Sequence, residues 1–392
     1  NEELIKFKLN IKKTDPLLTE EKVKSIQKQI ELCDLKITEI TKKPVKIKPK
    51  PPFITSTLQQ SASTRLGFNV KRTMRVAQKL YEAGLITYMR TDAPSLSKES
   101  INVARGFINE NLGDKYLTNA PKIYSSTENA QEAHEAVRPT NAFLKPQDVM
   151  QLSEEESKLY KLIWERFVAS QLPDAEYLST SAKIVIENNT FIARGRELVF
   201  DGFTKVLKSS SKEEDILPSL NEGDLIARKS IDLEQKFTKP PSRYSEAALV
   251  RELEKKGIGR PSTYANIIST IQDRGYVAIE NKRFFVKKIG HIVAERLLES
   301  FDNIMDYDFT ANLENSLDEV ANGDATIETY TIMHDRKGPS FGILFGRLSD
   351  GSRFIANTPD DLDLMLEMTS NDYLGAEGKV KEVNGVNIFT PS

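Results

Sequence analysis

Residues 86–92 read Ile-Thr-Tyr-Met-Arg-Thr-Asp, which places a tyrosine two positions before an arginine at the end of a basic stretch. A tyrosine phenol is a weak nucleophile at neutral pH, so its attack on a phosphodiester needs nearby cations that stabilise the developing negative charge. Tyr88 could be this nucleophile and Arg90 one such cation. If residues 86–91 form a strand, both side chains point to one face and could meet one phosphate. A structural tyrosine would fit the same spacing.

A second candidate site is the run Gly-Ile-Gly-Arg-Pro-Ser-Thr at residues 257–263, which joins two predicted helices. Glycines allow a tight turn, and proline suits the first turn of a helix. The hydroxyls of Ser262 and Thr263, beside free N–H groups, could form an anion site at the helix N-terminus. Arg260 and, about four helical turns later, Arg274 could add charge to the same phosphate or its neighbour. An ordinary connection between two helices would have the same composition.

A third candidate is the run Ala-His-Glu-Ala-Val-Arg-Pro-Thr at residues 133–140. His134, close to Arg138 in the sequence, could donate a hydrogen bond to a phosphate oxygen or shuttle the proton of a departing hydroxyl. A lone histidine more commonly has a structural role, so this run by itself does not define a catalytic group.

Length and composition restrict the kinds of protein that could carry these sites. A chain of 392 residues is long enough for two to four domains, and its 39% hydrophobic and 29% charged residues are typical of a globular protein. The sequence shows neither an apolar run long enough to span a bilayer nor a secretory signal, so we expect a cytoplasmic location and no membrane partner. A single cysteine, Cys33, and three dispersed histidines exclude an internal disulfide and argue against a zinc site. Because the first residue is Asn, we expect a fragment or a processed chain.

The net charge of -2 conceals two basic regions. Residues 41–90 contain eleven Lys and Arg against one acidic residue, and residues 236–290 contain twelve against five. Residues 325–392 instead carry six basic and ten acidic residues. Two separate basic regions in an otherwise acidic chain are typical of a nucleic-acid surface assembled by folding, although solvated surface lysines would give a similar count.

Residue patterns predict a mainly helical block, then strands, then helices again. Ser56 to Gln59 fits a capping box, and the basic, proline-rich segment before it predicts an extended hinge. Alternating short apolar runs over 176–234 predict strands, and helices return from Ser245. Further helices are predicted over residues 19–33, 71–84, 97–111 and 153–171, the last with Trp164 on a core face.

Four segments of the chain closely resemble bacterial type IA DNA topoisomerases, also called DNA topoisomerase I or omega protein. They are Pro52 to Asp92, Gln131 to Thr140, Phe237 to Val277 and Phe309 to Gly323. The resemblance extends over residues 1–323. It implies a multidomain α+β fold that forms a fragment of the type IA topoisomerase toroid, with a β-rich arch, a helical tyrosine domain and a helical base.

The resemblance also implies domain boundaries and residue roles. The arch would comprise residues 1–47 and 175–244, the tyrosine domain 48–174 and the base domain 245–323. Tyr88 would attack one strand to form a 5'-phosphotyrosine, Arg90 would steady the scissile phosphate, and His134 would assist. The residues implied to bind single-stranded DNA are Gln59, Arg138, Arg260, Ser262, Thr263 and Arg274.

Two departures from the family pattern modify these expectations. The TOPRIM domain, which in the family binds magnesium through an acidic cluster and supplies a lysine to the scissile phosphate, has no counterpart in this sequence. The Asp-x-Asp at Asp361-Leu-Asp363 lies in the C-terminal half of the chain and predicts a solvated turn. From about Asp324 the sequence instead resembles the small C-terminal β domain of acetyl-CoA acetyltransferase-like, thiolase-like proteins, without a thiolase nucleophile.

The expected function is therefore that of a type IA topoisomerase fragment acting on single-stranded and negatively supercoiled DNA without ATP. Magnesium is the implied cofactor, and we expect a nucleoid-associated monomer that does not relax DNA by itself. The alternatives are a catalytically incompetent fragment that only binds single-stranded DNA, and an acyl-CoA-linked accessory role for the tail.

Overall fold

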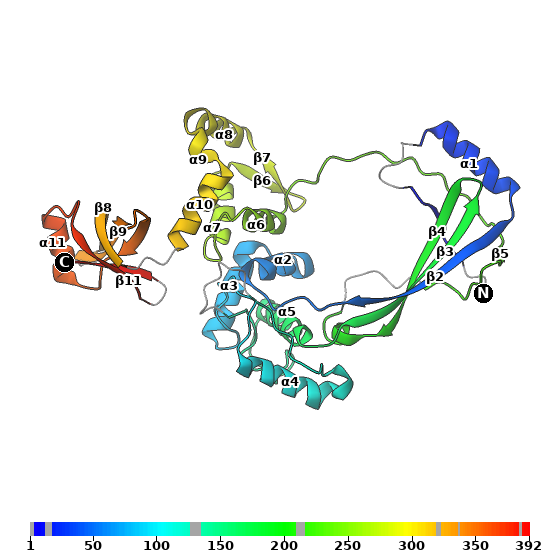
Figure 1. The fold of residues 1–392 in the computed structure, drawn as a ribbon, viewed down its shortest axis with the longest axis horizontal. Coiled ribbons are helices and arrows are strands. Elements are labelled where there is room, and N and C mark those ends of the chain that lie inside the picture. The colour runs from blue at the N-terminus through cyan, green and yellow to red at the C-terminus, as the bar shows by residue number, and fades with distance from the viewer. Residues whose placement is uncertain are drawn as a thin grey trace. The chain divides into compact units, whose positions relative to one another are not determined.

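The computed structural model describes residues 4–11, 18–125, 135–208, 216–318, 323–335, 338–383 and 386–392. The chain forms two compact units, residues 1–247 and 248–392. The fold is mixed α+β, as the sequence predicted (Figure 1). His134 lies outside the described residues.

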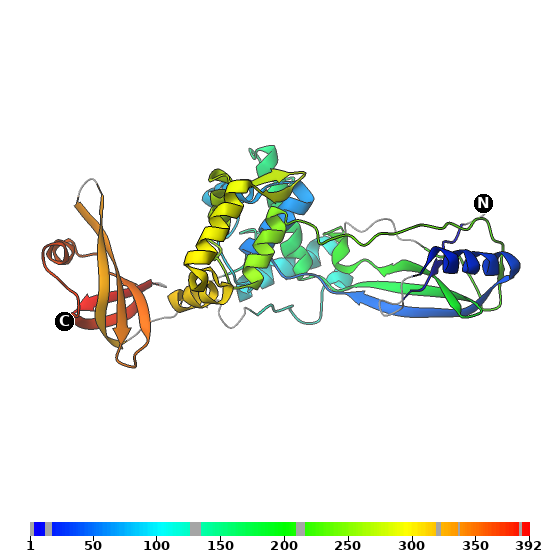
Figure 2. The same ribbon diagram turned by 90° about the horizontal axis from the view of Figure 1, so that it is seen from above.

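The first unit contains a five-stranded sheet in the order β1-β4-β3-β2-β5, and all its pairings are antiparallel. Helix α1 (Glu20–Leu32) lies beside the turn between β3 and β4, where the amide of Asn189 donates to Gln29 at 3.2 Å (Figure 2). The strands are β1 (Lys8–Leu9), β2 (Leu35–Ile47), β3 (Ala175–Ile186), β4 (Asn189–Phe200) and β5 (Leu225–Ile226).

The first residues of the proline-rich segment are extended, as predicted, but they belong to strand β2 and not to a hinge. The last residues of β2, including Lys42, Lys43 and Pro44, pair with β3. Pro44 is tolerated there because β5 pairs with β2 only at Leu35 and Lys36, which leaves the other edge of β2 unpaired at the proline.

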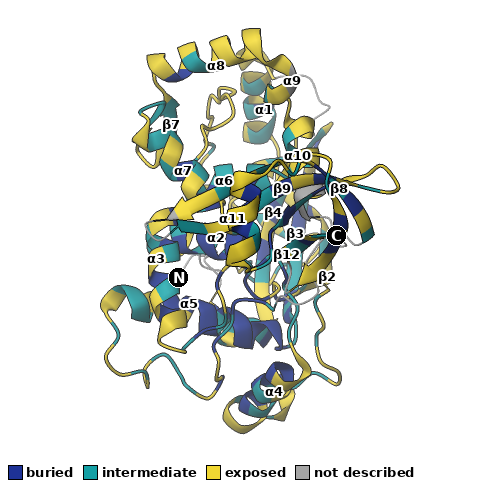
Figure 3. Ribbon diagram, turned by 90° about the vertical axis from the view of Figure 1, so that its left-hand side faces the viewer, coloured by how far each residue is buried: buried dark blue, intermediate teal, exposed yellow. Residues whose placement is uncertain are grey.

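The helices of the first unit surround one apolar core. Helix α5 is its most buried element, and Trp164 is buried as predicted (Figure 3). The predicted helices over 19–33, 71–84, 97–111 and 153–171 are confirmed to within one or two residues. The helices are α2 (Thr55–Leu66), α3 (Val70–Glu82), α4 (Lys98–Leu112) and α5 (Glu154–Ser170), with short 3-10 turns at Asp114–Tyr116 and Gly202–Lys205.

The cap of α2 is not at Ser56 and Gln59, where the sequence predicted a capping box, but at Ile54 and Thr57. Helix α2 begins at Thr55, and the Thr57 hydroxyl accepts from the Ile54 N–H at 3.0 Å. Ser56 and Gln59 are buried inside the helix, where their side chains face the protein rather than the helix terminus.

The second unit begins with helices and ends in a small barrel. Its first part contains α6 (Glu246–Lys255), α7 (Tyr264–Asp273), α8 (Lys288–Ser300), α9 (Asp302–Met305) and α10 (Tyr307–Asp318). The hairpin of β6 (Val277–Glu280) and β7 (Arg283–Val286) separates α7 from α8. This pattern agrees with the predicted return of helices after Ser245.

The C-terminal part is a closed five-stranded barrel in the order β10-β12-β11-β8-β9. Its interior is filled by side chains such as Leu344, Val380, Phe354 and Phe389. The predicted turn at Asp361 is the N-cap of α11, where its carboxylate accepts from the N–H groups of Asp363 and Leu364. The elements are β8 (Gly323–Asp335), β9 (Gly338–Leu348), β10 (Arg353–Asn357), α11 (Leu362–Ser370), β11 (Glu377–Val383) and β12 (Val386–Pro391).

Candidate active site around Tyr88

Tyr88 lies in the loop that follows α3, and this loop is not the strand that the sequence suggested. Only Ile86 forms an isolated bridge, to Pro139. Burial still alternates along the loop, because Met89 and Thr91 are almost fully buried while Tyr88 and Arg90 are exposed. The loop therefore directs the two predicted functional side chains to solvent through buried neighbours rather than through sheet pairing.

Thr55, at the start of α2, fixes the loop on the C-terminal side of Tyr88. Its buried hydroxyl lies 2.8 Å from the Met89 carbonyl and 3.0 Å from the Thr91 carbonyl, and it accepts from the Thr91 N–H at 2.8 Å. A hydroxyl has one proton, so it donates to one of the two carbonyls at a time. The Thr55 N–H also donates to the Thr91 carbonyl at 2.9 Å. The backbone on both sides of Arg90 is thus held by the same residue.

Thr87 fixes the loop on the other side of Tyr88. Its hydroxyl donates to the Ala136 carbonyl at 2.7 Å and accepts from the Arg138 N–H at 3.0 Å, while its own N–H donates to the Arg138 carbonyl at 2.9 Å. The Thr140 N–H donates to the Leu85 carbonyl at 3.0 Å. The segment after His134 is therefore bound to the tyrosine loop, as expected if the two runs form one site.

Arg138 has an internal partner. Its guanidinium donates two hydrogen bonds to the Glu135 carboxylate, at 2.7 and 2.9 Å, and a third to the Pro139 carbonyl. Burial raises the pKa of Glu135, but the bonds from Arg138, the Ser97 N–H and the Ser100 hydroxyl outweigh it and hold the pKa below its ordinary value. This ion pair positions Arg138 as part of the frame, and the structure does not present it to DNA as a free cation.

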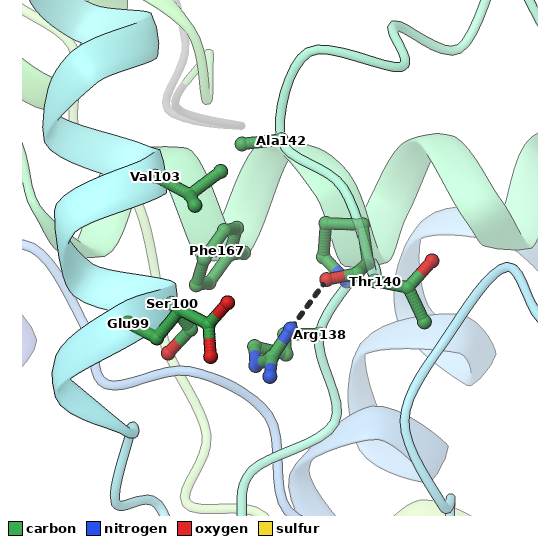
Figure 4. A pocket seen from close by; sticks show the side chains of 8 residues that line it. Glu99, Ser100, Val103, Arg138, Thr140, Ala142 and Phe167 are labelled. Carbon is green, nitrogen blue, oxygen red and sulfur yellow. Dashed lines mark hydrogen bonds between the residues drawn. The ribbon is translucent and has the colours of Figure 1, made fainter.

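A cavity of about 150 Å³ lies beside this ion pair (Figure 4). Arg138 and Thr140 line it on one side and the first turns of α4 on the other, where Glu99 and Ser100 face it. Its size suits a few water molecules rather than a nucleotide. It is therefore a feature of the frame and carries no binding role here.

Tyr88 and Arg90 contrast with Arg138, because their side chains have no polar partner among the described residues. Tyr88 is 45% exposed, and its ring meets that of Tyr81 edge-on with centroids 5.2 Å apart. Within the described residues, neither the Tyr88 hydroxyl nor the Arg90 guanidinium makes a hydrogen bond or ion pair. A phenol and a guanidinium two residues apart, both exposed on a fixed loop, can both approach one phosphate.

Gln59 differs from its predicted role. Its side chain is fully buried, and neither amide atom has a hydrogen-bond partner in the described part of the chain. In this conformation DNA cannot reach the amide.

Sequence reasoning missed the residues that build the frame. Thr55, Thr87 and Glu135 are ordinary surface residue types, and only their contacts across 34 to 49 positions show their function. Arg166, on α5, was also missed. It is 8% exposed, lies 4.4 Å from the centroid of the Phe53 ring, and burial together with the nearby Arg65 lowers its pKa to about 10.

The second predicted site, in the other unit, is a tight turn occupied by a carboxylate of the protein. Gly257 and Gly259 have φ of 70° and 79°, a conformation that favours glycine. The Glu314 carboxylate, from α10, accepts from the Gly259 N–H at 2.8 Å and from the Arg260 guanidinium at 3.1 Å. The Thr263 hydroxyl accepts from the Arg260 N–H at 2.8 Å. Glu314 thus takes up the Gly259 N–H and part of the Arg260 charge, and the predicted anion site at Ser262 and Thr263 stays a prediction.

The two arginines of this region are not equivalent. Arg260 precedes α7 and also bonds the Gly257 and Gly259 carbonyls, whereas Arg274 is exposed at the C-cap of α7. They are separated by a ten-residue helix, about 15 Å, which is too far for one phosphate. This separation favours the second alternative, in which Arg274 adds charge to a neighbouring phosphate, and the roles of both arginines stay predictions. Ser262 is exposed beside Arg260.

The described residues lack two further kinds of feature, a metal-binding cluster and a membrane-spanning helix. No group of three or more His, Cys, Asp or Glu side chains in these ranges could hold a metal ion. Among the helices in the described ranges, none is long and apolar enough to cross a membrane.

Comparisons with known proteins agree with the resemblance. Residues 2–331 match the family model described as DNA topoisomerase. Residues 306–384 match the model described as the thiolase-like protein type 1 additional C-terminal domain. The tail is thus similar to a module from a different class of protein, as its sequence indicated.

Individual relatives show the same assignment. DNA topoisomerase 1 of Pseudomonas aeruginosa is 56% identical over 284 residues, which is 72% of this chain and 33% of the relative. DNA topoisomerase 1 of Escherichia coli strain K12 is 53% identical over 298 residues, 76% of this chain and 34% of the relative. Full-length topoisomerase I from Thermotoga maritima superposes with a TM-score of 0.70 at 27% identity, covering 98% of this chain and 66% of that structure. The chain spans about a third of the length of the curated relatives.

Proposed function

Because the chain belongs to the DNA topoisomerase family, type IA, we propose that it carries the strand-cleaving part of such an enzyme, with Tyr88 as the nucleophile. The observation that supports this most directly is the exposed pair of Tyr88 and Arg90, neither of which bonds to a described residue through its polar side-chain group, on a loop held from both sides by threonine hydroxyls. A structural tyrosine would instead be packed and hydrogen-bonded.

The proposed reaction is an exchange of phosphodiester bonds. The Tyr88 oxygen attacks a backbone phosphorus of one DNA strand, a Tyr O–P bond forms, and the bond from phosphorus to the 3' oxygen breaks. The phenol proton leaves to solvent or a base, and the departing 3' oxygen takes up a proton. The Arg90 guanidinium stabilises the charge on the phosphate oxygens during both steps. Resealing is the reverse, so the 5'-phosphotyrosine conserves the bond energy and no nucleotide is hydrolysed.

The proposed substrate is single-stranded DNA within negatively supercoiled DNA. Cleaving one strand, passing the other through the break and resealing would relax the supercoils. In this proposal the sheet of β2, β3 and β4 belongs to the arch of the family's ring, the helices around Tyr88 form the tyrosine domain, and α6 to α10 belong to the base. Arg138 and Gln59 have only supporting roles in this proposal, since the Arg138 guanidinium bonds to Glu135 and Pro139 and the Gln59 side chain is buried. His134, which lies outside the described residues, has the assisting role that the resemblance implies.

Magnesium, which the family uses, does not fit the described residues. They contain no acidic cluster that could hold it, and the Asp361 carboxylate caps the N-terminus of α11. We therefore assign no step of the proposed reaction to a metal held by these residues.

Because the described residues do not fit magnesium, a second candidate function is favoured, in which these 392 residues bind single-stranded DNA but do not cleave and reseal it. The two candidates share the binding surface and differ only in whether Tyr88 reacts. A plasmid relaxation assay at large excess of protein, with and without magnesium, distinguishes complete turnover from binding alone. We expect no relaxation. Magnesium-dependent relaxation that disappears in Tyr88→Phe would instead show that these residues suffice.

The nucleophile is tested by covalent trapping. A single-stranded oligonucleotide labelled at its 3' end is incubated with the chain, magnesium and a separately supplied TOPRIM domain, and the mixture is denatured. We expect label on the protein with the unaltered chain and none with Tyr88→Phe, which removes only the attacking oxygen. Tyr81→Phe is the matched control, because that exposed ring touches Tyr88 and should leave the yield unchanged. Equal yield from Tyr88→Phe would exclude Tyr88.

A further inference from the structure

The C-terminal barrel has the strand arrangement of an OB-fold. Three consecutive strands, β8, β9 and β10, form an antiparallel meander. β10 then pairs in parallel with β12, and β11 closes the barrel by pairing antiparallel with both β12 and β8. Helix α11 lies between β10 and β11 in the sequence, as in that fold. In OB-folds the outer face of the second and third strands, here β9 and β10, binds oligonucleotides or oligosaccharides.

The outer face of β9 carries side chains suited to stacking. Along β9 the buried positions are Gly342, Leu344 and Gly346, so the alternation of the strand directs the side chains of Phe341 and Phe345 outward. These two rings are 43% and 44% exposed. On the neighbouring strands, Met333 is paired with Phe341, and Ile355 with Phe345. The result is an exposed apolar strip with two aromatic rings on one face of the barrel.

Two arginines continue this face. Arg347 and Arg353 are directly opposite each other on β9 and β10, and both contact the Glu328 carboxylate, at 2.8 and 2.7 Å. Glu328 lies between the two guanidinium groups, and Asp350 lies in the hairpin turn that joins β9 to β10, so the arginines add hydrogen-bond donors to this face without a surplus of positive charge. Glycines at positions 342 and 346 are required beneath the strip, because a Cβ there would lie 2.4 Å from Thr358 and 2.5 Å from Phe354.

The net charge of the barrel is negative, and this limits the kinds of contact through which it could bind nucleic acid. Residues 323–392 contain eleven acidic and six basic residues, and four of the acids lie at or just before α11. An acidic module cannot attract a polyanion by net charge, so binding of nucleic acid here would depend on base stacking with little help from salt-sensitive contacts.

We infer that the face formed by Phe341, Phe345, Arg347 and Arg353 is a second binding site for single-stranded DNA, in which bases stack on the two phenylalanine rings. The choice of DNA as the ligand rests on the proposed function of the rest of the chain. The site is separate from the Tyr88 loop and from the basic regions of the sequence. It would retain a strand through contacts that persist at salt concentrations where purely electrostatic binding is lost.

The test uses the full chain and a fluorescent oligothymidylate in an anisotropy titration at low salt and at about 0.3 M salt. At high salt, Phe341→Leu/Phe345→Leu should weaken binding about tenfold or more, because stacking contributes roughly five- to a hundredfold per base. Leucine keeps the apolar surface and the strand, so folding should be preserved, which a thermal melt checks. Phe143→Leu is the matched control, since that ring is 41% exposed in the other unit.

A second readout locates the contact. Photo-crosslinking with an oligonucleotide that contains 4-thiothymidine should label the tryptic peptide that includes Phe345 in the unaltered chain and not in the double variant. Unchanged affinity at high salt and no label in the barrel would overturn the proposal. So would a change of self-association in the double variant without a change in DNA binding, since that result would make the face a protein interface. Tyr88→Phe should bind normally here, so failure of this site is distinguishable from failure of the cleavage proposal.

Discussion

The Tyr88 loop and the Gly257–Thr263 turn both present an arginine on a tight, immobilised backbone, yet they use the cation differently. Arg90 is exposed and makes no hydrogen bond or ion pair within the described residues. Arg260 is tied to Glu314, Asn315 and two backbone carbonyls. The difference lies in what holds each backbone in place.

Neutral groups hold the Tyr88 loop. Hydroxyls of Thr55 and Thr87 bond to carbonyls and N–H groups on either side of the tyrosine, so the charge of Arg90 is left for a ligand. In the Gly257–Thr263 turn the arginine itself fastens the turn to α10, and the Glu314 carboxylate already accepts from the Gly259 N–H. The first arrangement is suited to a reacting phosphate, and the second to holding a turn in shape.

The largest expected effect is on Arg90. Arg90→Ala should lower the yield of covalent adduct about a hundredfold or more, because it removes a cation that acts on charge developing at the phosphate. The melting temperature should not change, since the Arg90 side chain bonds to none of the residues that the structure describes. Arg90→Lys keeps the charge and should recover part of the yield. A large loss of stability in Arg90→Ala would show that the arginine belongs to the frame, as Arg138 does.

The neutral frame is tested by Thr55→Val, which keeps the shape and removes the hydroxyl. Backbone groups of Met89 and Thr91 would lose a buried partner, so the free energy of unfolding should fall by about 1–3 kcal/mol. Adduct yield should fall as well, because the loop is no longer fixed. Thr64→Val, at an exposed position of the same helix, should have little effect on denaturant unfolding. If both variants unfold alike, the Thr55 contacts do not stabilise the loop.

The role of the second arginine is tested by Glu314→Gln, which keeps an acceptor for the Gly259 N–H and removes the charge facing Arg260. Single-stranded DNA should then bind more tightly, by at most about 1 kcal/mol because the pair is partly exposed. Arg274→Ala, measured in the same titration, should weaken binding without changing stability. Weaker binding in Glu314→Gln would mean that the carboxylate orients Arg260 toward DNA instead of occupying its site.

The smallest expected effect is a pH dependence from Glu135. Its pKa in the folded chain lies below its ordinary value, so the unfolded chain binds the proton more readily and the ion pair stabilises folding above the unfolded pKa. This contribution should be lost as pH falls through the folded pKa, below 4.5. Unfolding of Glu135→Gln should lack that part of the acid dependence. An identical pH profile would show that the Arg138 pair does not contribute.

Much of the fold followed from local patterns. The helix that contains Trp164 was predictable because Ser153 and Glu156 form a capping box ahead of an amphipathic run. The capping box was predicted at Ser56 because serine is a common N-cap residue. In the structure the hydroxyl at the helix start belongs to Thr57, and Ser56 is buried. Pro44 within β2 was not foreseen, since only the short pairing with β5 reveals an open edge.

The sequence by itself determined the chemistry available at Tyr88 and Arg90 and the two positive-φ glycines of the turn, because residue type and spacing fix nucleophilicity, charge and backbone freedom. Only the tertiary structure decided which cations remain available. Arg260 meets Glu314 across 54 positions, and Gln59 is buried by packing that no local pattern records. Whether a charged side chain is free or neutralised depends on groups far away in the sequence, and folding alone brings them together.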